Sequence, residues 1–134
     1  MPPQPPSPQS LQVAQEWLTR AEHDLQASRT LLSAPTALPE ISAYHAQQAA
    51  EKSMKAFLTA WSEEFTFTHD LVKLQAKCEA LEPAFASLLS AAQTLTPYAT
   101  EFRYPPGRTA PTYSEAEEAT QLGQSILSFV RGHL

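Results

Sequence analysis

The sequence predicts an all-α fold, an up-and-down bundle of four to five helices, on three observations. Apolar side chains recur at three- and four-residue steps through several long stretches, which is the spacing of one face of an α-helix. The 134 residues include only three glycines, whereas a β-rich fold needs more of them for its turns. The twelve prolines are clustered, and the long stretches between them are free of proline, as helix interiors must be.

A single domain is expected, because 134 residues is an ordinary size for one domain. Residues 1–9 are rich in proline and are expected to form an extended or disordered tail. Residues 10–134 are then one helical domain. Its long helices and short connections favour antiparallel neighbours.

The first helix is predicted to begin near Ser7 or Ser10 and to run to about Leu32. Pro8 directly after Ser7 fits a capping residue followed by proline in the first turn. One apolar stripe runs along this helix, formed by Leu11, Ala14, Trp17, Leu18, Ala21, Leu25, Ser28 and Leu32.

The second helix is predicted over about residues 40–63, after a break at residues 35–39. Its core face consists of Ala46, Ala50, Met54, Phe57 and Trp61. His45, Gln48, Lys52 and Lys55 recur at i, i+3, i+7 and i+10, and at about 100° per residue this polar stripe lies nearly opposite the Phe57–Trp61 face.

A third helix is expected over about residues 69–81, with Thr68 or Asp70 as its cap. A short fourth helix is expected to start at Pro83 and to stop at Pro97.

The final helix is predicted from Ser114 to about Arg131, with Ser114 and Glu117 forming a capping box. Residues 97–113, before it, hold four prolines and several aromatic residues, which indicates a loop with ordered structure because aromatic side chains favour burial.

The formal net charge of −5 gives no general attraction to nucleic acid, although it does not exclude a local basic site. Cys78 is the single cysteine, so no internal disulfide is possible and a reducing cytoplasm suits the chain. The chain has no apolar run long enough to span a membrane, and its first residues do not resemble a secretory signal.

Three stretches carry side chains suited to chemistry: YHAQQAAEKSMKAFL in the second helix, FTHDL after it, and EFRYP before the last helix. Their order and spacing resemble the HEPN domains of bacteria and archaea, and in particular a nucleotidyltransferase-associated subgroup with an Arg-Tyr-Pro segment. The resemblance covers about Gln15 to the C-terminus. It implies a helical bundle that is often a homodimer and is frequently encoded beside, or fused to, a minimal nucleotidyltransferase.

Other HEPN domains are metal-independent RNases of toxin–antitoxin and defence systems, and these carry an arginine, four to six residues, then a histidine. No arginine of this chain has a histidine at that spacing. Arg20 reaches His23 after two residues, and Arg131 reaches His133 after one. The resemblance therefore implies a binding module more than an RNase, and whether the chain is an enzyme stays open.

The polar stripe of the second helix has two interpretations. It is either a plain solvated face, in which Glu51 and Lys55 form a favourable i, i+4 pair, or a polar groove in which Lys52 meets a phosphate as a point charge. Candidates for the same groove are also His45, Gln48 and Lys55 of this stripe and Glu51 beside it.

The other two motifs are also open to two interpretations each. His69 and Asp70 either cap the third helix, or place an imidazole oriented by a carboxylate that carries a proton near neutral pH. Arg103 and Tyr104 either anchor the loop, or supply a guanidinium for phosphate and a ring for a base.

The first hypothesis is a nucleotide- or partner-binding module that presents Lys52, His69 and Arg103 and needs no cofactor. The second is a divergent metal-independent RNase, the toxin of a toxin–antitoxin pair, that uses His69 as acid and base and Arg103 to stabilise the phosphate. The third is a structural interaction protein. No metal site is expected, because the sequence has no CxxC, no HExxH and no histidines at ligand spacing.

Overall fold

The computed structural model describes residues 3–99 and 109–134, and within them it contains helices and no strand. The elements in chain order are α1 (Pro8–Ser33), α2 (Pro39–Ala60), α3 (Leu71–Leu81), the 3₁₀ helix η1 (Pro83–Leu88), α4 (Leu89–Leu95), the 3₁₀ helix η2 (Thr96–Ala99) and α5 (Tyr113–Gly132). The all-α prediction is confirmed. None of the helices in these two ranges is both long and apolar enough to cross a membrane.

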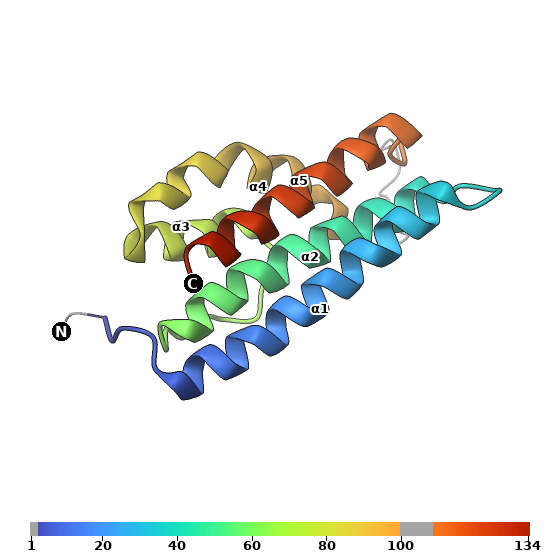
Figure 1. Cartoon of the computed structure of the whole chain (residues 1–134). Helices are drawn as coiled ribbons and strands as arrows, with labels where there is room; N and C mark the ends of the chain where they lie inside the picture. The colour runs from blue at the N-terminus through green and yellow to red at the C-terminus, as the bar shows by residue number, and fades with distance from the viewer. Residues whose placement is uncertain (1–2, 100–108) are drawn as a thin grey trace.

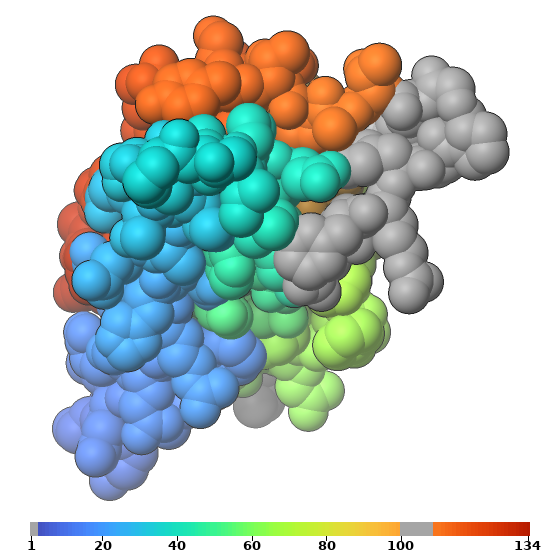
Figure 2. All heavy atoms as spheres, turned by 90° about the vertical axis from the view of Figure 1, so that its right-hand side faces the viewer, coloured from blue at the N-terminus to red at the C-terminus, as the bar shows by residue number. Residues whose placement is uncertain are grey.

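The three long helices lie side by side, with α2 between α1 and α5 (Figure 1). α1 and α2 are antiparallel, and α5 runs in the same direction as α2. The shorter α3 and α4 pack against one side of this layer. The connection between α1 and α2 lies at the end of the bundle where α5 begins, beside the first turns of α5 (Figure 2).

α2 is the central helix of the core. From Ala46 to Ala60, every side chain is buried except Lys52 and Thr59. Many of these residues are alanines, and small side chains let neighbouring helices approach closely. The approach of α5 is close at Gly123, where an added Cβ would lie 3.0 Å from the carbonyl oxygen of Ala46.

The start of α1 agrees with the expectation from sequence. The Ser7 hydroxyl accepts a hydrogen bond from the Ser10 amide at 3.0 Å, and Pro8 occupies the first helical position. The Ser10 hydroxyl also donates to the carbonyl of Ala60 at 2.7 Å, which ties the first turn of α1 to the last turn of α2.

The capping box predicted for the final helix is wrong by two residues. The Thr112 hydroxyl accepts from the Glu115 amide at 3.1 Å, and the Glu115 carboxylate accepts from the Thr112 amide at 3.0 Å. The hydroxyl-x-x-Glu spacing occurs twice here, and the first instance caps the helix because α5 begins one residue before Ser114.

Three other element boundaries differ from the prediction. Pro97, expected to stop the fourth helix, lies inside the 3₁₀ helix η2 that follows α4. α2 ends at Ala60 rather than near residue 63, and Ser62 has a left-handed backbone with φ of 54°, which turns the chain away. The segment after Pro83 forms a 3₁₀ helix before the α-helical α4 begins.

Candidate functional site

The first polar cluster is centred on Asp24 of α1. Its carboxylate accepts hydrogen bonds from His45 Nδ1 at 2.9 Å and from Lys52 Nζ at 2.5 Å, both on α2. Burial alone would raise the pKa of Asp24, but the hydrogen bonds and charges of His45 and Lys52 together hold that pKa below its usual value. Asp24 is therefore ionised at neutral pH and fixes both α2 side chains.

The second cluster is centred on Glu51 of α2. Its carboxylate accepts from His69 Nδ1 at 2.8 Å and from Lys55 Nζ at 2.9 Å. The amide of Gln47, one turn earlier, donates to Glu51 at 3.3 Å and to the main-chain carbonyl of His69 at 3.1 Å. Both the backbone and the ring of His69 are thus held against α2.

The two histidines differ in their access to solvent. The side chain of His69 is 47% exposed, whereas Glu51 behind it is 5% exposed. Because Nδ1 bonds to Glu51, Nε2 is the ring nitrogen of this partly exposed side chain that is left to bond a ligand. The side chain of His45 is 29% exposed and is bonded through Nδ1 to Asp24 in the same way.

The ammonium group of Lys55 is enclosed by aromatic rings. It lies 5.7 Å from the ring centroid of each of Trp17, Phe65 and Phe67. Its side chain is buried and is paired with Glu51, so both charges are removed from water together. Cation–π contacts and a direct ion pair stabilise such a buried charge. Lys55 therefore holds the segment between α2 and α3 in place.

The two clusters meet on one turn of α2. Glu51 and Lys52 are consecutive, so the residues they bond, His69 and Asp24, flank the same turn from its two sides. Each cluster contains one carboxylate and one lysine, so the charges balance when the histidines are neutral. Protonation of a histidine gives the face a net positive charge.

The packing of α2 decides between the two interpretations of its polar stripe. The polar stripe of α2 is not a plain solvated face, because Gln48 and Lys55 are buried. The stripe packs against α1 on one side and against the segment before α3 on the other, and Gln48 Nε2 donates to Gln47 Oε1 at 2.7 Å. Only His45 and Lys52 of the four stripe residues are partly exposed.

Asp70 is the cap of α3, as one of the two interpretations predicted. Its carboxylate accepts from the Val72 amide at 3.0 Å. The carboxylate that orients His69 belongs to Glu51 instead. Sequence adjacency suggested Asp70, but only the fold shows that Glu51 reaches the imidazole.

Arg103 and Tyr104 lie outside the described residues, so the third motif is not placed relative to the first two.

Sequence reasoning missed Asp24, Gln47 and Phe67. Asp24 has a signal in retrospect, because it lies beside the core positions Ala21, Leu25 and Ser28 on α1, where an unpaired acid would be costly. Gln47 has none, since glutamine is ordinary on any helix face. Phe67 has a weak signal as an aromatic residue two positions before His69.

A shallow depression of about 500 Å³ between α1 and α2 reaches the site at His45. It is lined by His23, Gln26, Ala27, Thr30, Leu31, Ile41 and His45.

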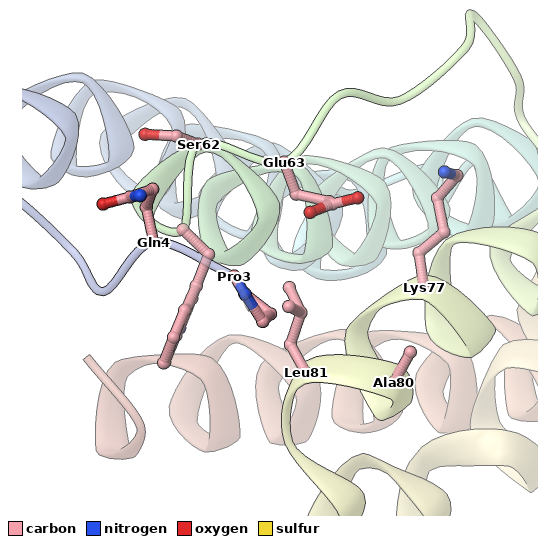
Figure 3. A pocket seen from close by; sticks show the side chains of 8 residues that line it. Pro3, Gln4, Ser62, Glu63, Lys77, Ala80 and Leu81 are labelled. Carbon is pink, nitrogen blue, oxygen red and sulfur yellow. The ribbon is translucent and has the colours of Figure 1, made fainter. Parts of the chain in front are cut away.

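Another depression, of about 530 Å³, lies at the opposite end of α2 and includes none of the predicted site residues (Figure 3). Its lining includes Pro3 and Leu81 and the charged side chains of Glu63 and Lys77. Within residues 3–99 and 109–134, no group of three or more histidine, cysteine, aspartate or glutamate side chains could hold a metal ion.

Fold and site together define a small helical-bundle domain with a polar, histidine-bearing face on its central helix. The HEPN domain model matches residues 14–133, which is most of the chain, and the chain belongs to the HEPN domain family. No curated protein matches the chain significantly.

Two solved structures are similar to it. The protein TT1696 from Thermus thermophilus has a TM-score of 0.78 and 31% sequence identity, and the alignment covers 90% of this chain and 98% of TT1696. ST0689, an archaeal HEPN homologue, has a TM-score of 0.71 and 25% identity, and the alignment covers 90% of this chain and 96% of ST0689.

Proposed function

We propose that the chain is a nucleotide- or partner-binding module. The observation that carries this proposal is the exposed imidazole of His69, whose Nδ1 is bonded to the buried carboxylate of Glu51. Glu51 lies on the same turn of α2 as Lys52, which is partly exposed. A fixed histidine and a partly exposed lysine are donors that suit a phosphate group.

The ion pairs favour recognition of a particular phosphate ligand over general electrostatic attraction of anions. Asp24 neutralises Lys52 and Glu51 neutralises Lys55, so the face offers oriented donors without a large excess of positive charge. A phosphate at Nε2 of His69 would favour the protonated imidazole and would supply its counter-charge.

Arg103 and Tyr104 are proposed to complete the site, with the guanidinium at the phosphate and the ring near the base. Membership of the HEPN family supports a homodimer, and the resemblance to the nucleotidyltransferase-associated subgroup supports a minimal nucleotidyltransferase as partner. A cytoplasmic location is proposed because the one thiol, Cys78, is free.

Calorimetric titration of the purified chain with ATP and the other nucleoside triphosphates tests this function. We expect heat of binding in the wild type and a loss of about tenfold or more in His69→Ala, because one charge-assisted hydrogen bond is worth about 1.5–3 kcal/mol. His133→Ala is the matched control, since His133 is an exposed histidine at the end of α5. No heat with any nucleotide, together with no co-purifying partner, would contradict the proposal.

The second candidate is a divergent metal-independent RNase that acts as the toxin of a toxin–antitoxin pair. The pairing of His69 with Glu51 favours it, because a carboxylate-oriented imidazole can transfer protons. Arg103 would then stabilise the phosphate. RNA left intact by the wild type, or cut equally well by His69→Ala, would exclude this role.

The third candidate is a structural interaction protein, and the burial of Glu51 and Lys55 favours it. If the clusters serve only the fold, substitution of His69 lowers stability without changing any binding.

A further inference from the structure

Phe67 is far more exposed than the fold requires. This residue is 86% accessible, whereas the next most exposed large hydrophobic residue in the described part of the chain, Tyr113, is 48% accessible. Single exposed apolar side chains are common on proteins. What distinguishes Phe67 is its position beside the aromatic and charged groups of the proposed site.

The ring of Phe67 is held at one side by groups of that site. Its centroid lies 5.1 Å from that of the His69 imidazole at an interplanar angle of 74°, so the two rings meet edge to face rather than stacking flat. The buried Lys55 ammonium lies 5.7 Å from the same centroid. These contacts place the ring beside His69 and Lys55, while its 86% accessibility shows that most of its surface remains open.

The neighbouring residue Phe65 shows that Phe67 is not needed to cover the Lys55 ammonium. Phe65 is partly buried, meets Trp17 edge-on with centroids 6.4 Å apart, and lies at the same 5.7 Å from Lys55. Trp17 and Phe65 therefore already enclose the lysine, and Phe67 adds an exposed surface beside His69.

We propose that Phe67 is a base-stacking residue of this site, with a nucleobase lying on its exposed ring while His69 donates to the phosphate. The inference rests on the nucleotide-binding function proposed above and names the part of the ligand that Phe67 would recognise. Every base has a π-face, so stacking on one ring tolerates different bases. A free nucleotide and the terminal nucleotide of an RNA share this chemistry.

The test compares Phe67→Ala, Phe67→Trp and the control Tyr113→Ala, which removes an exposed aromatic ring from α5. Each is titrated with ATP, with tripolyphosphate, which has no base, and with a short oligoribonucleotide. We expect Phe67→Ala to weaken ATP binding about tenfold or more and to leave tripolyphosphate binding unchanged. Phe67→Trp should retain ATP binding, with the indole fluorescence quenched by the stacked base, and Tyr113→Ala should behave as wild type.

The outcomes separate this inference from the function on which it rests. If Phe67→Ala binds ATP as the wild type does while both bind tripolyphosphate, stacking is excluded and the phosphate site stands. If the wild type binds neither ATP nor tripolyphosphate, the nucleotide site itself is excluded and stacking with it. Oligoribonucleotide binding that is tighter than ATP binding and depends on Phe67 would support stacking and identify RNA as the source of the base.

The fold of each variant is checked by its circular dichroism spectrum and thermal midpoint. Because Phe67 is almost fully exposed, Phe67→Ala should melt close to the wild type. If its weaker ATP binding were accompanied by a collapsed midpoint and by equal weakening toward tripolyphosphate, the effect would be structural and the stacking role would be overturned.

Discussion

Glu51 shows how one side chain can serve both the fold and the site. It neutralises Lys55, which lies behind the aromatic rings, and it orients His69, which faces solvent. Replacing it therefore affects stability and binding through separate partners.

Glu51→Ala is expected to lower the free energy of unfolding by about 3–5 kcal/mol, because it leaves the buried ammonium of Lys55 without a carboxylate. Urea denaturation measures this loss. Glu22→Ala is the matched control, since Glu22 pairs with Arg131 on the surface and an exposed pair is worth about 1 kcal/mol or less. Equal losses of unfolding free energy in both variants would show that burial does not make the Glu51–Lys55 pair more important to stability than a surface pair.

The lowered pKa of Asp24 predicts how the stability of the fold depends on pH. Its pKa is lower in the folded protein than in the unfolded chain, so the unfolded chain binds more protons in acid and stability falls as pH drops below about 4. Asp24→Asn should be less stable than wild type at pH 7, and the difference should shrink as pH falls through the pKa of Asp24. Urea midpoints measured between pH 7 and pH 3 check this, and a difference that stays constant would contradict the ion-paired arrangement.

At the scale of the helices, the packing of α5 on α2 depends on a residue without a side chain. A Cβ at Gly123 would lie 3.0 Å from the Ala46 carbonyl oxygen and 3.2 Å from Leu25 Cδ2. The first of these is main-chain oxygen on a buried helix and has little room to move.

Gly123→Ala should therefore destabilise the protein by roughly 1–3 kcal/mol, although alanine is the better helix former. Gly132→Ala, in the same helix, has no atom within 4 Å of the added Cβ and should be neutral or slightly stabilising. Thermal and urea unfolding of the two variants check the contrast. A stabilised Gly123→Ala would show that α2 and α5 can separate slightly without loss.

The cap of α5 offers a second test at this scale. Thr112→Ala should cost about 0.5–2 kcal/mol because the first turn of α5 loses its side-chain acceptor, whereas Ser114→Ala, already inside the helix and exposed, should cost little. Urea unfolding of both variants decides which residue caps the helix, and the reverse order would favour the Ser114–Glu117 box.

For the molecule as a whole, the sequence was sufficient to predict the helices. Their apolar periodicity, the prolines that begin α1 and η1, and the cap at Ser7 are local signals, and these are confirmed. Local signals could not predict which face of α2 is covered. His45, Gln48, Lys52 and Lys55 read as one stripe, but the fold covers Gln48 and Lys55 and leaves the other two partly open.

The candidate site shows the same division between local and tertiary information. The sequence predicts His69 and Lys52 as site residues, because a motif specifies which residue types are present. Their partners, Asp24 and Glu51, are determined by the packing of α1 and of residues 61–70 on α2, which no spacing rule contains. The exposure of Phe67 is a property of the folded chain, so its position in the sequence does not predict it.

The most direct test of the account is to record the ring ¹⁵N and ¹H resonances of the histidines while ATP is added. Binding at the proposed site should shift His69 first and most, moving Nε2 toward the protonated form, while His133 stays unchanged. Saturable ATP binding that leaves the His69 resonances in place would contradict the account, because the ligand would then lie elsewhere on the molecule.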